Sequence, residues 1–520
     1  MNNLTRSFIL LVILIFITST TIAQLSSPEV DSIVENAIQK FNVAGVAVAI
    51  VKDGKIVHSK GYGVKSINTK EKVDEHTQFL IASNSKAFTT AALAILVDEG
   101  KVAWDDKVVD YLPEFKMYNP YVTENFIIQD LLSHRSGLGL GAGDLMFIPD
   151  SNDFTIDDIL TNYQYFEPES PFRTTFAYNN LLFIMSGEII ARVSGMSWEE
   201  FIKARILEPL NMDNSSSSLS QIIDRSNLAA SHSTNNNTPV PINHFSDMVN
   251  GAAAGIYSNA DDLCNWMLLQ LNNGKYGDSL ENQLFSEAAQ REMWKIHTTL
   301  NASRNPRYNA HFSGYGLGWG LSDNNGNLSV SHTGGMPGML SKTILIPDIN
   351  LGVVVLTNTT DGGAGVFASV TNTIVDSYMG LDNNDWVGKY YAYFQKREKR
   401  GDSITNQVWE TVNSAVDDHI NTEDYIGIYE DNWFGKVEVY LNDNQLWFSS
   451  SRSPKLTGPM YYYKANTFAI KWDYRDMNAD AFAIFSLDEE GKAHSIKMKG
   501  ISPNIDFSFD FQDLDLRRIK

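Results

Sequence analysis

Cysteine and long apolar runs are both scarce in this 520-residue chain. Cys264 is the single cysteine, so an intramolecular disulfide is excluded, and its place in an apolar helical segment predicts a buried thiol that is not a nucleophile. The apolar run from Phe8 to Ile17 has ten residues, against the roughly 20 that a membrane-spanning helix needs. We therefore expect no stable membrane anchor.

That apolar run is typical of an export signal. Arg6 precedes it, and small and polar residues follow it up to Ala23, where a signal peptidase could cut. No cysteine stands at this point, which argues against a lipoprotein anchor. We predict a signal peptide at residues 1–23 and a periplasmic or secreted mature protein.

Basic residues are outnumbered, with 41 Lys and Arg against 62 Asp and Glu and a formal net charge of −21. Nucleic acids and anionic membranes would repel such a chain, so we expect neither as a partner. The one visible basic cluster, Lys396–Arg400, is most simply a solvated helix face. The chain is long enough for two or three domains.

Ser83 and Lys86 stand three residues apart at the predicted start of a helix. Residues i and i+3 share a helix face, so the hydroxyl and the amine can meet. A serine becomes a good nucleophile when a neighbouring base takes its proton, which a desolvated lysine can do. The segment 77–82 predicts a strand and Ala87–Glu99 a buried helix, whose dipole would favour negative charge at Ser83. An ordinary N-cap serine is the alternative interpretation.

Two further clusters carry candidate site residues. Tyr178 and Asn180 are two residues apart in a loop or extended segment, so their side chains point to the same side. The segment 331–338 follows a strand-like approach at Leu328–Val330 and breaks into the glycines from Gly334, where the backbone could approach a ligand closely. Each cluster alone could be a turn.

Together these motifs resemble the serine β-lactamase and penicillin-binding-protein superfamily, which has the order Ser-x-x-Lys, Tyr-x-Asn, then Lys-Thr-Gly or His-x-Gly. The resemblance is to class C β-lactamases, D-Ala-D-Ala carboxypeptidases and esterase-like serine hydrolases of the peptidase family S12 type, and it covers roughly residues 28–380. The matching motifs and blocks are Ser83–Lys86, Tyr178–Asn180, His332–Gly334, Asp130–Leu138, Gly251–Asp262 and Tyr315–Trp319. Tyr257 and Tyr440 also begin Tyr-x-Asn triplets. Tyr257 leads from a glycine turn into a capped amphipathic helix that has a structural role in the superfamily, and Tyr440 lies in the separate C-terminal region, so we favour Tyr178.

The resemblance implies acyl transfer in two steps, with no metal or cofactor. Ser83 would attack a carbonyl while Lys86 and Tyr178 remove its proton, and the same pair would later activate water. Which of the two is the base stays open, because a lysine beside a phenol shares its proton. The backbone N–H groups of Ser83 and Gly335 would form the oxyanion hole. The implied catalytic residues are Ser83, Lys86, Tyr178 and His332, and the implied substrate-binding residues are Asn180, Thr333, Gly334 and Gly335.

His332 stands where β-lactamases of this superfamily carry lysine. Histidine, with an unperturbed pKa of about 6.5, is mostly neutral at pH 7 and would recognise a carboxylate weakly. We therefore expect a peptidase, amidase or esterase with a small-molecule, peptide or ester substrate. The alternatives are a class C-like β-lactamase or D,D-carboxypeptidase, a polysaccharide deacylase, and a non-catalytic binding or sensing protein. The sequence does not indicate an oligomeric state.

The resemblance also implies an α+β fold class for residues 24–380: a β-lactamase-like sandwich with a central antiparallel sheet, flanking helices and an all-helical subdomain. The patterns at 28–41 and 367–379 predict helices that fit this fold, and those at 44–51, 56–62, 342–347 and 351–358 predict strands. Residues 381–423 predict a helical linker with helices at 386–400 and 406–416.

Residues 424–520 predict a small all-β barrel, which resembles the lipocalin-like domain often appended to such hydrolases. Short alternating segments between turns indicate strands at 437–441, 445–449, 467–472, 481–487 and 494–499. The many aromatic residues are most simply core. In a second interpretation, some of them line a ligand pocket or cover the mouth of the active site.

Overall fold

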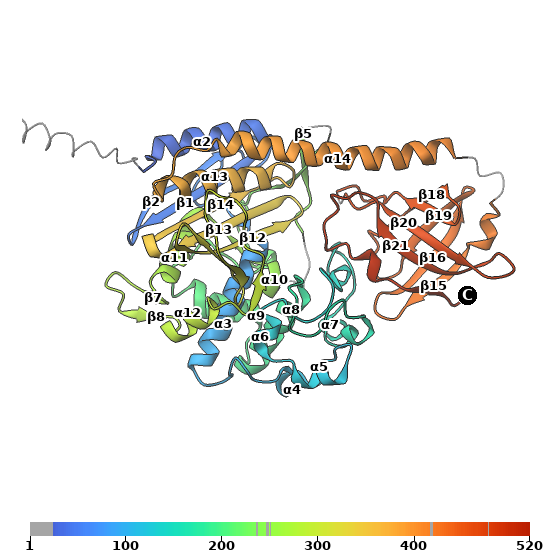
Figure 1. Ribbon diagram of the computed structural model, residues 1–520, viewed down its shortest axis with the longest axis horizontal. Coiled ribbons are helices and arrows are strands. Elements are labelled where there is room, and N and C mark those ends of the chain that lie inside the picture. Colours follow the sequence, from blue (N-terminus) through green and yellow to red (C-terminus); the bar gives the residue numbers. More distant parts are fainter. Residues whose placement is uncertain (1–23, 236–237, 246–248, 250, 416–419, 477) are drawn as a thin grey trace, which may run out of the picture.

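The computed structural model describes residues 24–235, 238–245, 249, 251–415, 420–476 and 478–520. The predicted signal peptide lies outside the described residues. A sheet covered by helices and a separate barrel make up the fold (Figure 1). Both parts of the predicted fold class are confirmed, the α+β sandwich and the C-terminal all-β barrel.

An eight-stranded antiparallel sheet, with the strand order β2-β1-β14-β13-β12-β11-β10-β9, forms the centre of the larger part. The first and last strands of this part therefore pair side by side, with Val48 opposite Val355. The strands are β1 Gly45–Lys52, β2 Lys55–Gly63, β9 Thr298–Leu300, β10 Ser313–Tyr315, β11 Gly320–Asn324, β12 Asn327–Met336, β13 Met339–Ile346 and β14 Leu351–Thr357.

Both faces of this sheet are buried, and alternating side chains of β1 show why. Ala47, Ala49 and Val51 belong to the core cluster that contains α3 and α11, whereas Val48 and Ile50 belong to the cluster that contains α2 and α13. Successive side chains of a strand point to opposite faces, so a continuous apolar run fits a strand covered on both sides. The segments predicted at 44–51 and 351–358 form β1 and β14.

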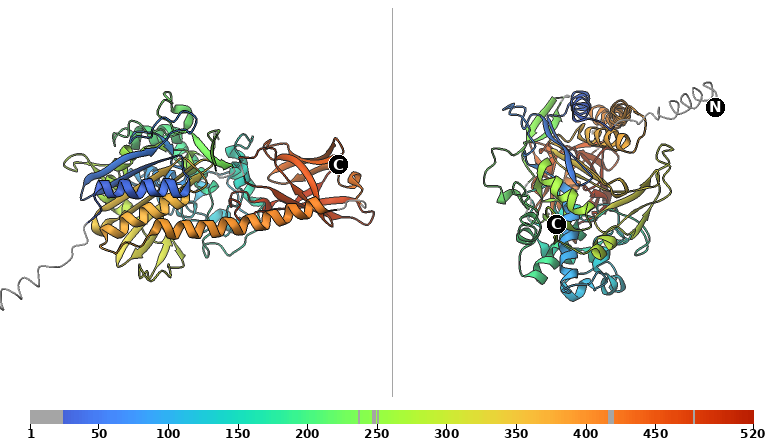
Figure 2. Two further views of the ribbon diagram at one scale, coloured as in Figure 1. Left: turned by 90° about the horizontal axis from the view of Figure 1, so that it is seen from above. Right: turned by 90° about the vertical axis from the view of Figure 1, so that its left-hand side faces the viewer.

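One face carries α2, α13 and the start of α14, and the other carries the remaining large helices (Figures 1 and 2). The N-terminus of α2 has a capping box, in which the Glu29 carboxylate accepts hydrogen bonds from the backbone N–H and the hydroxyl of Ser26. The bounds are α2 Ser27–Phe41, α3 Ser85–Asp98, α8 Leu181–Ser194, α11 Ala260–Leu271 and α13 Gly363–Tyr378.

Shorter elements build the helical part beside the sheet. Among the described residues no single helix has the length and hydropathy to cross a membrane, and one bent pair, Leu181–Ser194 with Trp198–Leu207, meets the criterion by length and composition only. The short elements are α4 Val108–Tyr111, α5 Pro120–Asn125, α6 Ile128–Leu131, α7 Ile156–Asn162, α9 Trp198–Ile202, α10 Gly251–Ala254, α12 Glu287–Met293, β3 Phe79–Leu80, β4 Ser231–Asn235, β5 Thr238–Ile242, β6 Tyr257–Ser258, β7 Lys275–Tyr276 and β8 Asn282–Gln283.

Helix α14, Trp386–Ser414, joins the two parts of the chain. It is one continuous helix, so the prediction of two helices separated near residue 401 is wrong. Its first turns pack on the sheet domain, where Tyr391 and Phe394 meet Phe41 edge to face with ring centroids 5.8 and 6.4 Å away. Further along it meets the barrel, as Figure 2 shows from above. The basic run within it is exposed, as predicted.

The C-terminal barrel is closed by eight antiparallel strands, with β22 pairing back to β15. All five predicted strands are present, and the sequence patterns missed β15, β18 and β22, which are short or carry glycine and proline. Phe434, Phe448 and Trp472 are buried in it, whereas Trp447 and Tyr461 are half-buried. The strands are β15 Gly427–Asp431, β16 Gly435–Asn442, β17 Gln445–Ser450, β18 Thr457–Lys464, β19 Thr467–Ile470, β20 Ala481–Leu487, β21 Ala493–Gly500 and β22 Leu516–Arg518.

The barrel docks on the helical part through mixed contacts. The Trp433 ring lies 4.8 Å from that of Phe166, and its backbone oxygen accepts a hydrogen bond from Asn162 Nδ2 at 3.1 Å. Arg452 reaches across to the carboxylates of Asp153 and Asp158 at 2.7 and 2.8 Å. Aromatic packing and paired charges together fix the barrel against the loops that surround the candidate site.

Candidate active site

Ser83 sits on a sharp turn between β3 and α3. It lies in a 3₁₀ turn, Ala82–Asn84, that runs directly into the helix. Ala82 has a φ of +48°, in the left-handed region that a residue with a side chain rarely adopts. The strained backbone turns the chain so that Ser83 stays partly exposed while its neighbours Ala82 and Asn84 are buried. The predicted helix is present, and it begins at Ser85.

Lys86 is fully buried and points its amine at Ser83. Its Nζ lies 3.1 Å from Ser83 Oγ, 2.7 Å from Asn180 Oδ1 and 2.9 Å from the backbone oxygen of Ala253. Burial lowers the pKa of Lys86 to about 7, against a smaller opposing effect of the Asp144 carboxylate. Near neutral pH a large fraction of the amine is therefore uncharged.

Tyr178 is brought to the same place. Lys86 Nζ lies 4.9 Å from the centre of its ring. Its hydroxyl is buried, and among the described residues it has no hydrogen-bond partner of good geometry. Burial raises the pKa of Tyr178 above its ordinary value, while the nearby Ser83 side chain acts in the opposite direction. Tyr257 lies in the short strand β6 and Tyr440 in the barrel, whereas the ring of Tyr178 lies beside the Lys86 amine.

The block Asp130–Leu138 holds the loop that carries Tyr178. His134 accepts the backbone N–H of Asn179 through Nδ1 at 3.0 Å, and its ring centre lies 4.1 Å from that of Tyr178. The buried Asp130 carboxylate binds two guanidinium groups, with shortest contacts of 2.7 Å to Arg135 and 2.6 Å to Arg173. The loop is therefore held on both sides of Tyr178, through Arg173 before it and Asn179 after it.

Asn180 is buried, and both ends of its amide are occupied within the protein. Oδ1 accepts from Lys86 Nζ, and Nδ2 donates to Asp144 Oδ2 at 2.7 Å. In this structure it therefore orients the lysine, whereas the family resemblance implies contact with substrate. Burial raises the pKa of Asp144 to about 8, against the opposing effects of its hydrogen bonds to Ser508 and Asn180 and of the Lys86 charge.

His332 is a neutral imidazole of defined tautomer. Nδ1 lies 2.6 Å from the backbone oxygen of Thr333, which accepts only, so Nδ1 carries the proton. Nε2, 2.8 Å from the Tyr315 hydroxyl, is then the acceptor. Burial, followed by the charge of Lys86, lowers the pKa of His332 to about 3. His332 therefore offers no positive charge to a substrate.

Gly334 and Gly335 do not break the strand as predicted, because β12 continues through them to Met336. A Cβ on Gly334 would lie 2.1 Å from the backbone oxygen of Ile81, so only glycine lets β12 pass the Ser83 turn.

The side chain of Thr333 is exposed and points to the opposite face of β12 from the side chain of His332. Its backbone oxygen, and not its hydroxyl, contacts the site histidine.

The strand register directs the N–H of Gly335 away from β13. Met336 and Met339 pair across a two-residue turn, so these two exchange both backbone hydrogen bonds. Hydrogen-bonded and non-hydrogen-bonded pairs alternate along an antiparallel ladder, so the next pair, Gly335 with Leu340, makes no backbone hydrogen bonds to each other. The N–H of Gly335 then points to the edge facing β11, which pairs with β12 only as far as Ser331. That open edge, next to the Ser83 turn, suits an oxyanion-binding N–H.

Four residues that the structure places in the site have no role predicted from the sequence. His134 and Tyr315 lay in blocks that match the superfamily, and their aromatic character was the only signal. Asp144 lies in a loop without a pattern, and Ser508 comes from the barrel. No local sequence signal could have paired Asp144 with Ser508, which donates to Asp144 Oδ2 at 2.8 Å.

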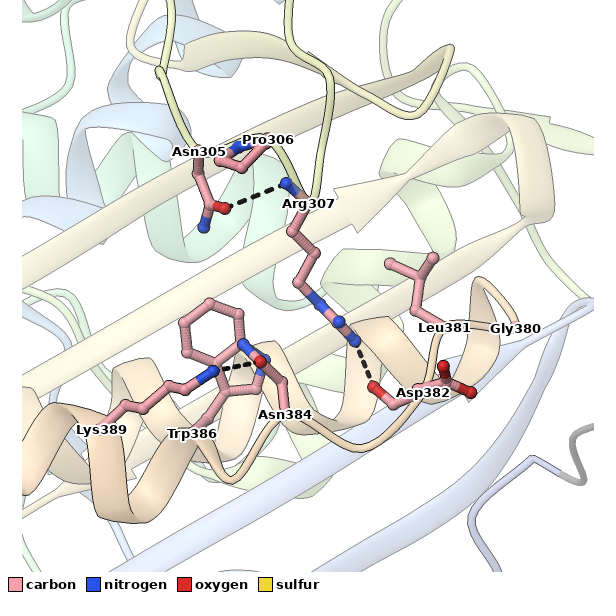
Figure 3. A pocket seen from close by; sticks show the side chains of 9 residues that line it. All are labelled: Asn305, Pro306, Arg307, Gly380, Leu381, Asp382, Asn384, Trp386 and Lys389. Carbon is pink, nitrogen blue, oxygen red and sulfur yellow. Dashed lines mark hydrogen bonds between the residues drawn. The ribbon is translucent and has the colours of Figure 1, made fainter.

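A hollow with a volume of about 680 Å³ lies away from these residues, between the loop at Asn305–Arg307 and the start of α14 (Figure 3). Its two cations already have partners: Arg307 pairs with Asp376 at 2.8 Å, and Lys389 hydrogen-bonds Asn384. None of the candidate site residues lines it. Among the described residues, no group of three or more His, Cys, Asp or Glu side chains could hold a metal ion.

Comparison with protein families supports the two-part architecture. Residues 30–370 match the family described as Beta-lactamase, and residues 415–518 match a domain of unknown function, DUF3471. Similar solved structures include an octameric penicillin-binding protein homologue from Pyrococcus abyssi, with a TM-score of 0.59 at 20% identity over 95% of this chain and 100% of that one. A class C β-lactamase from Rhodobacter sphaeroides gives a TM-score of 0.53 at 19% identity over 66% of this chain and 99% of that one.

Curated relatives are similar over the larger part of the chain. The unguisins hydrolase ungD' of Aspergillus campestris is 28% identical over 381 residues, which are 71% of this chain and 68% of the relative. Protein flp of Staphylococcus aureus is 29% identical over 334 residues, 64% of this chain and 63% of that protein. The family match covers well over half of the sequence, and the chain therefore belongs to the beta-lactamase family of serine hydrolases.

Proposed function

We propose that this protein is an exported serine hydrolase that cleaves amide or ester bonds through an acyl-enzyme on Ser83. The observation that carries the proposal is the environment of the Lys86 amine. Asn180 Oδ1 and the backbone oxygen of Ala253 can only accept, and they take two N–H groups. A neutral amine has two N–H groups and one lone pair, so the lone pair is left for the Ser83 hydroxyl.

In the acylation step, Ser83 Oγ forms a bond to the substrate carbonyl carbon as its proton passes to Lys86 Nζ. Lys86 is the better base of the two candidates, because burial lowers its pKa to about 7 and raises that of Tyr178. The Tyr178 hydroxyl, which is still protonated, is placed to donate to the leaving group. The carbonyl electron pair moves to oxygen, where the N–H groups of Ser83 and Gly335 would stabilise it.

Collapse of the tetrahedral intermediate breaks the bond to the leaving group, which departs with the proton held by Lys86, passed either directly or through Tyr178, whose hydroxyl the amine then reprotonates. Water then attacks the acyl carbon while Lys86, neutral again, accepts its proton. The electron pair returns to Ser83 Oγ, which recovers its proton from the same amine. Every proton is carried by groups already in the site.

The charges at the site favour substrates without a carboxylate. His332 is neutral, and the Asp506 carboxylate lies close enough to raise the pKa of both Asp144 and Tyr178. An anionic substrate would meet the repulsion of Asp506, and His332 offers it no positive charge. This argues against a class C-like β-lactamase or D,D-carboxypeptidase, whose substrates carry a carboxylate. The relative named as an unguisins hydrolase supports hydrolysis as the reaction class.

Two esters with the same leaving group test the proposal. We expect p-nitrophenyl butyrate to be hydrolysed with a kcat/KM at least about tenfold above that of p-nitrophenyl hemisuccinate, which adds a carboxylate at the end of a similar acyl chain. Ser83→Ala should abolish both activities and keep the fold. Equal turnover of the two esters would contradict the charge argument, and an active Ser83→Ala protein would contradict the mechanism.

Two parts of the proposal lie outside the site. Export with cleavage near Ala23 is tested by the N-terminal sequence of the protein recovered from its host's periplasm or medium. The lipocalin-like nature of the barrel remains a prediction, since the family that it matches is one of unknown function.

A further inference from the structure

A segment of the barrel domain reaches into the candidate active site. Residues 501–510 follow β21, and the Asp510 carboxylate accepts the backbone N–H groups of Gly143 and Leu145 at 2.7 and 2.9 Å. A Cβ on Gly141 would lie 2.7 Å from the backbone oxygen of Phe507, so the two backbones are in close contact. The loop that contains Asp144 is therefore held by the barrel.

Ser508 extends this contact to the catalytic lysine. Its buried hydroxyl donates to Asp144 Oδ2 at 2.8 Å, and the same oxygen accepts Asn180 Nδ2 at 2.7 Å. Asn180 Oδ1 in turn accepts from Lys86 Nζ at 2.7 Å. Three consecutive hydrogen bonds thus connect a serine of the C-terminal domain to the amine beside Ser83.

The orientation of the Asn180 amide depends on this connection. Asp144 Oδ2 accepts from Nδ2, and this keeps Oδ1 directed toward the lysine. A flipped amide would place an NH₂ group against the lysine, which would then turn its lone pair to that group and away from Ser83. Asp144 Oδ1 has no hydrogen-bond partner among the described residues, so Ser508 and Asn180 are the contacts that hold this carboxyl group.

Phe507 adds a surface contact beside the same residues. Its ring meets that of Tyr178 edge to face with centroids 5.7 Å apart, and the side chain is 39% exposed. An exposed ring against the catalytic tyrosine forms part of the wall that a substrate would meet. Segment 506–510 therefore contacts both the proton-transfer groups and the substrate side of the site.

We propose that segment 506–510 of the barrel domain is a working part of the active site, in which Ser508 is a positioning residue that keeps the Lys86 lone pair on Ser83 through Asp144 and Asn180. The inference rests on the proposed function of Ser83 and Lys86. It assigns the barrel a role in the reaction itself, beyond a module appended to a complete hydrolase.

Several ionisable groups face Asp144 and enter any pH dependence. Lys86 acts on it from α3, and Asp506 acts on it from the barrel segment. Asp144 in turn raises the pKa values of nearby groups on the other elements packed around it. The groups that face it are Lys86, Tyr163, Tyr178, Asp506 and Asp510.

The test compares Ser508→Ala with two controls in the full-length protein. Ser486→Ala removes an exposed hydroxyl of β20, and Arg452→Ala removes ion pairs that dock the barrel away from the site. For Ser508→Ala we expect kcat for p-nitrophenyl butyrate to fall about tenfold with KM within about twofold, since one hydrogen bond to a carboxyl group is lost. Ser486→Ala should match the wild type. An equal loss in Arg452→Ala, or a change in KM alone, would mean that docking in general is responsible and would overturn the proposal.

A second measurement does not depend on activity. Asp144 raises the pKa of Lys86, so Asp144→Asn should lower the midpoint of the lysine titration, which NMR of ¹³C-labelled lysine can follow. Ser508→Ala should shift the midpoint in the same direction by a smaller amount, because Asp144 loses a donor that favours its charged form. Unchanged midpoints in both variants would overturn the positioning role. If Ser83→Ala remained active, the proposed function would fail, while this titration would still decide whether Ser508 acts on Lys86.

Discussion

The pH dependence of acylation follows directly from the burial of Lys86. Burial lowers the pKa of this amine from 10.5 to about 7. The nucleophile is activated only when the amine is neutral, so the rate should rise with pH through this value and then level off. The perturbation is therefore a rise in pH, which removes the positive charge of the Lys86 amine without any mutation.

The size of the effect follows from the fraction of neutral amine. With a pKa of about 7, roughly one amine in eleven is neutral at pH 6 and roughly ten in eleven at pH 8, an increase of about tenfold. A lysine with an ordinary pKa would give an increase of about a hundredfold over the same range and would still be rising. His332 does not contribute here, because its pKa is lowered to about 3.

The assay is the second-order rate of labelling by a fluorophosphonate between about pH 5 and about pH 10 at constant ionic strength. Asp144, with a pKa raised to about 8, titrates in the same range and interacts with Lys86, so the observed midpoint reports both groups. Asp144→Asn isolates the lysine. A rate that is flat across this range, or that keeps rising beyond pH 9, would refute the argument that burial prepares Lys86 as the base.

Three substitutions give further predictions. Gly334→Ala should lower the melting temperature and should slow the rate of acylation more than tenfold, because the new Cβ would lie 2.1 Å from the backbone oxygen of Ile81. Gly320→Ala, whose new Cβ has its nearest contact at 3.2 Å, should be tolerated in the same thermal melts and labelling assays. His332→Lys should speed acylation by penicillin about tenfold in stopped-flow measurements, since it adds a cation for the carboxylate, and an unchanged rate would count against that reasoning. Trp433→Ala should cost about 3–5 kcal/mol of unfolding free energy in denaturant titrations, as its buried ring packs on Phe166; a loss below about 1 kcal/mol would show that the barrel docks without it.

Much of the fold could be predicted because its strongest patterns are local. The apolar runs of β1 and β14 and the amphipathic pattern of α2 specify their own secondary structure. The two errors arose where local signals mislead: α14 continues through Gly401, which lies against Asn504 of the barrel. Likewise, β12 continues through Gly334 and Gly335, because Gly334 packs on Ile81 and neither glycine forms a turn.

The candidate site was predictable only in part, for a different physical reason. Ser83 with Lys86, and Tyr178 with Asn180, lie close in sequence, so their spacing carries information. The orientation of Asn180 depends on Asp144, and Asp144 depends on Ser508, which is 364 residues away. Such contacts come from tertiary packing, and only the structure brings them together.

The intact mass of the mature protein after exposure to a fluorophosphonate tests the central claim most directly. The account predicts one phosphonyl adduct on the wild type, located on Ser83 by peptide mapping, and none on Ser83→Ala. Lys86→Met should react at least about a hundredfold more slowly, because the hydroxyl loses its base. An adduct on another residue, or equal labelling of wild type and Ser83→Ala, would contradict the assignment of Ser83 as the nucleophile.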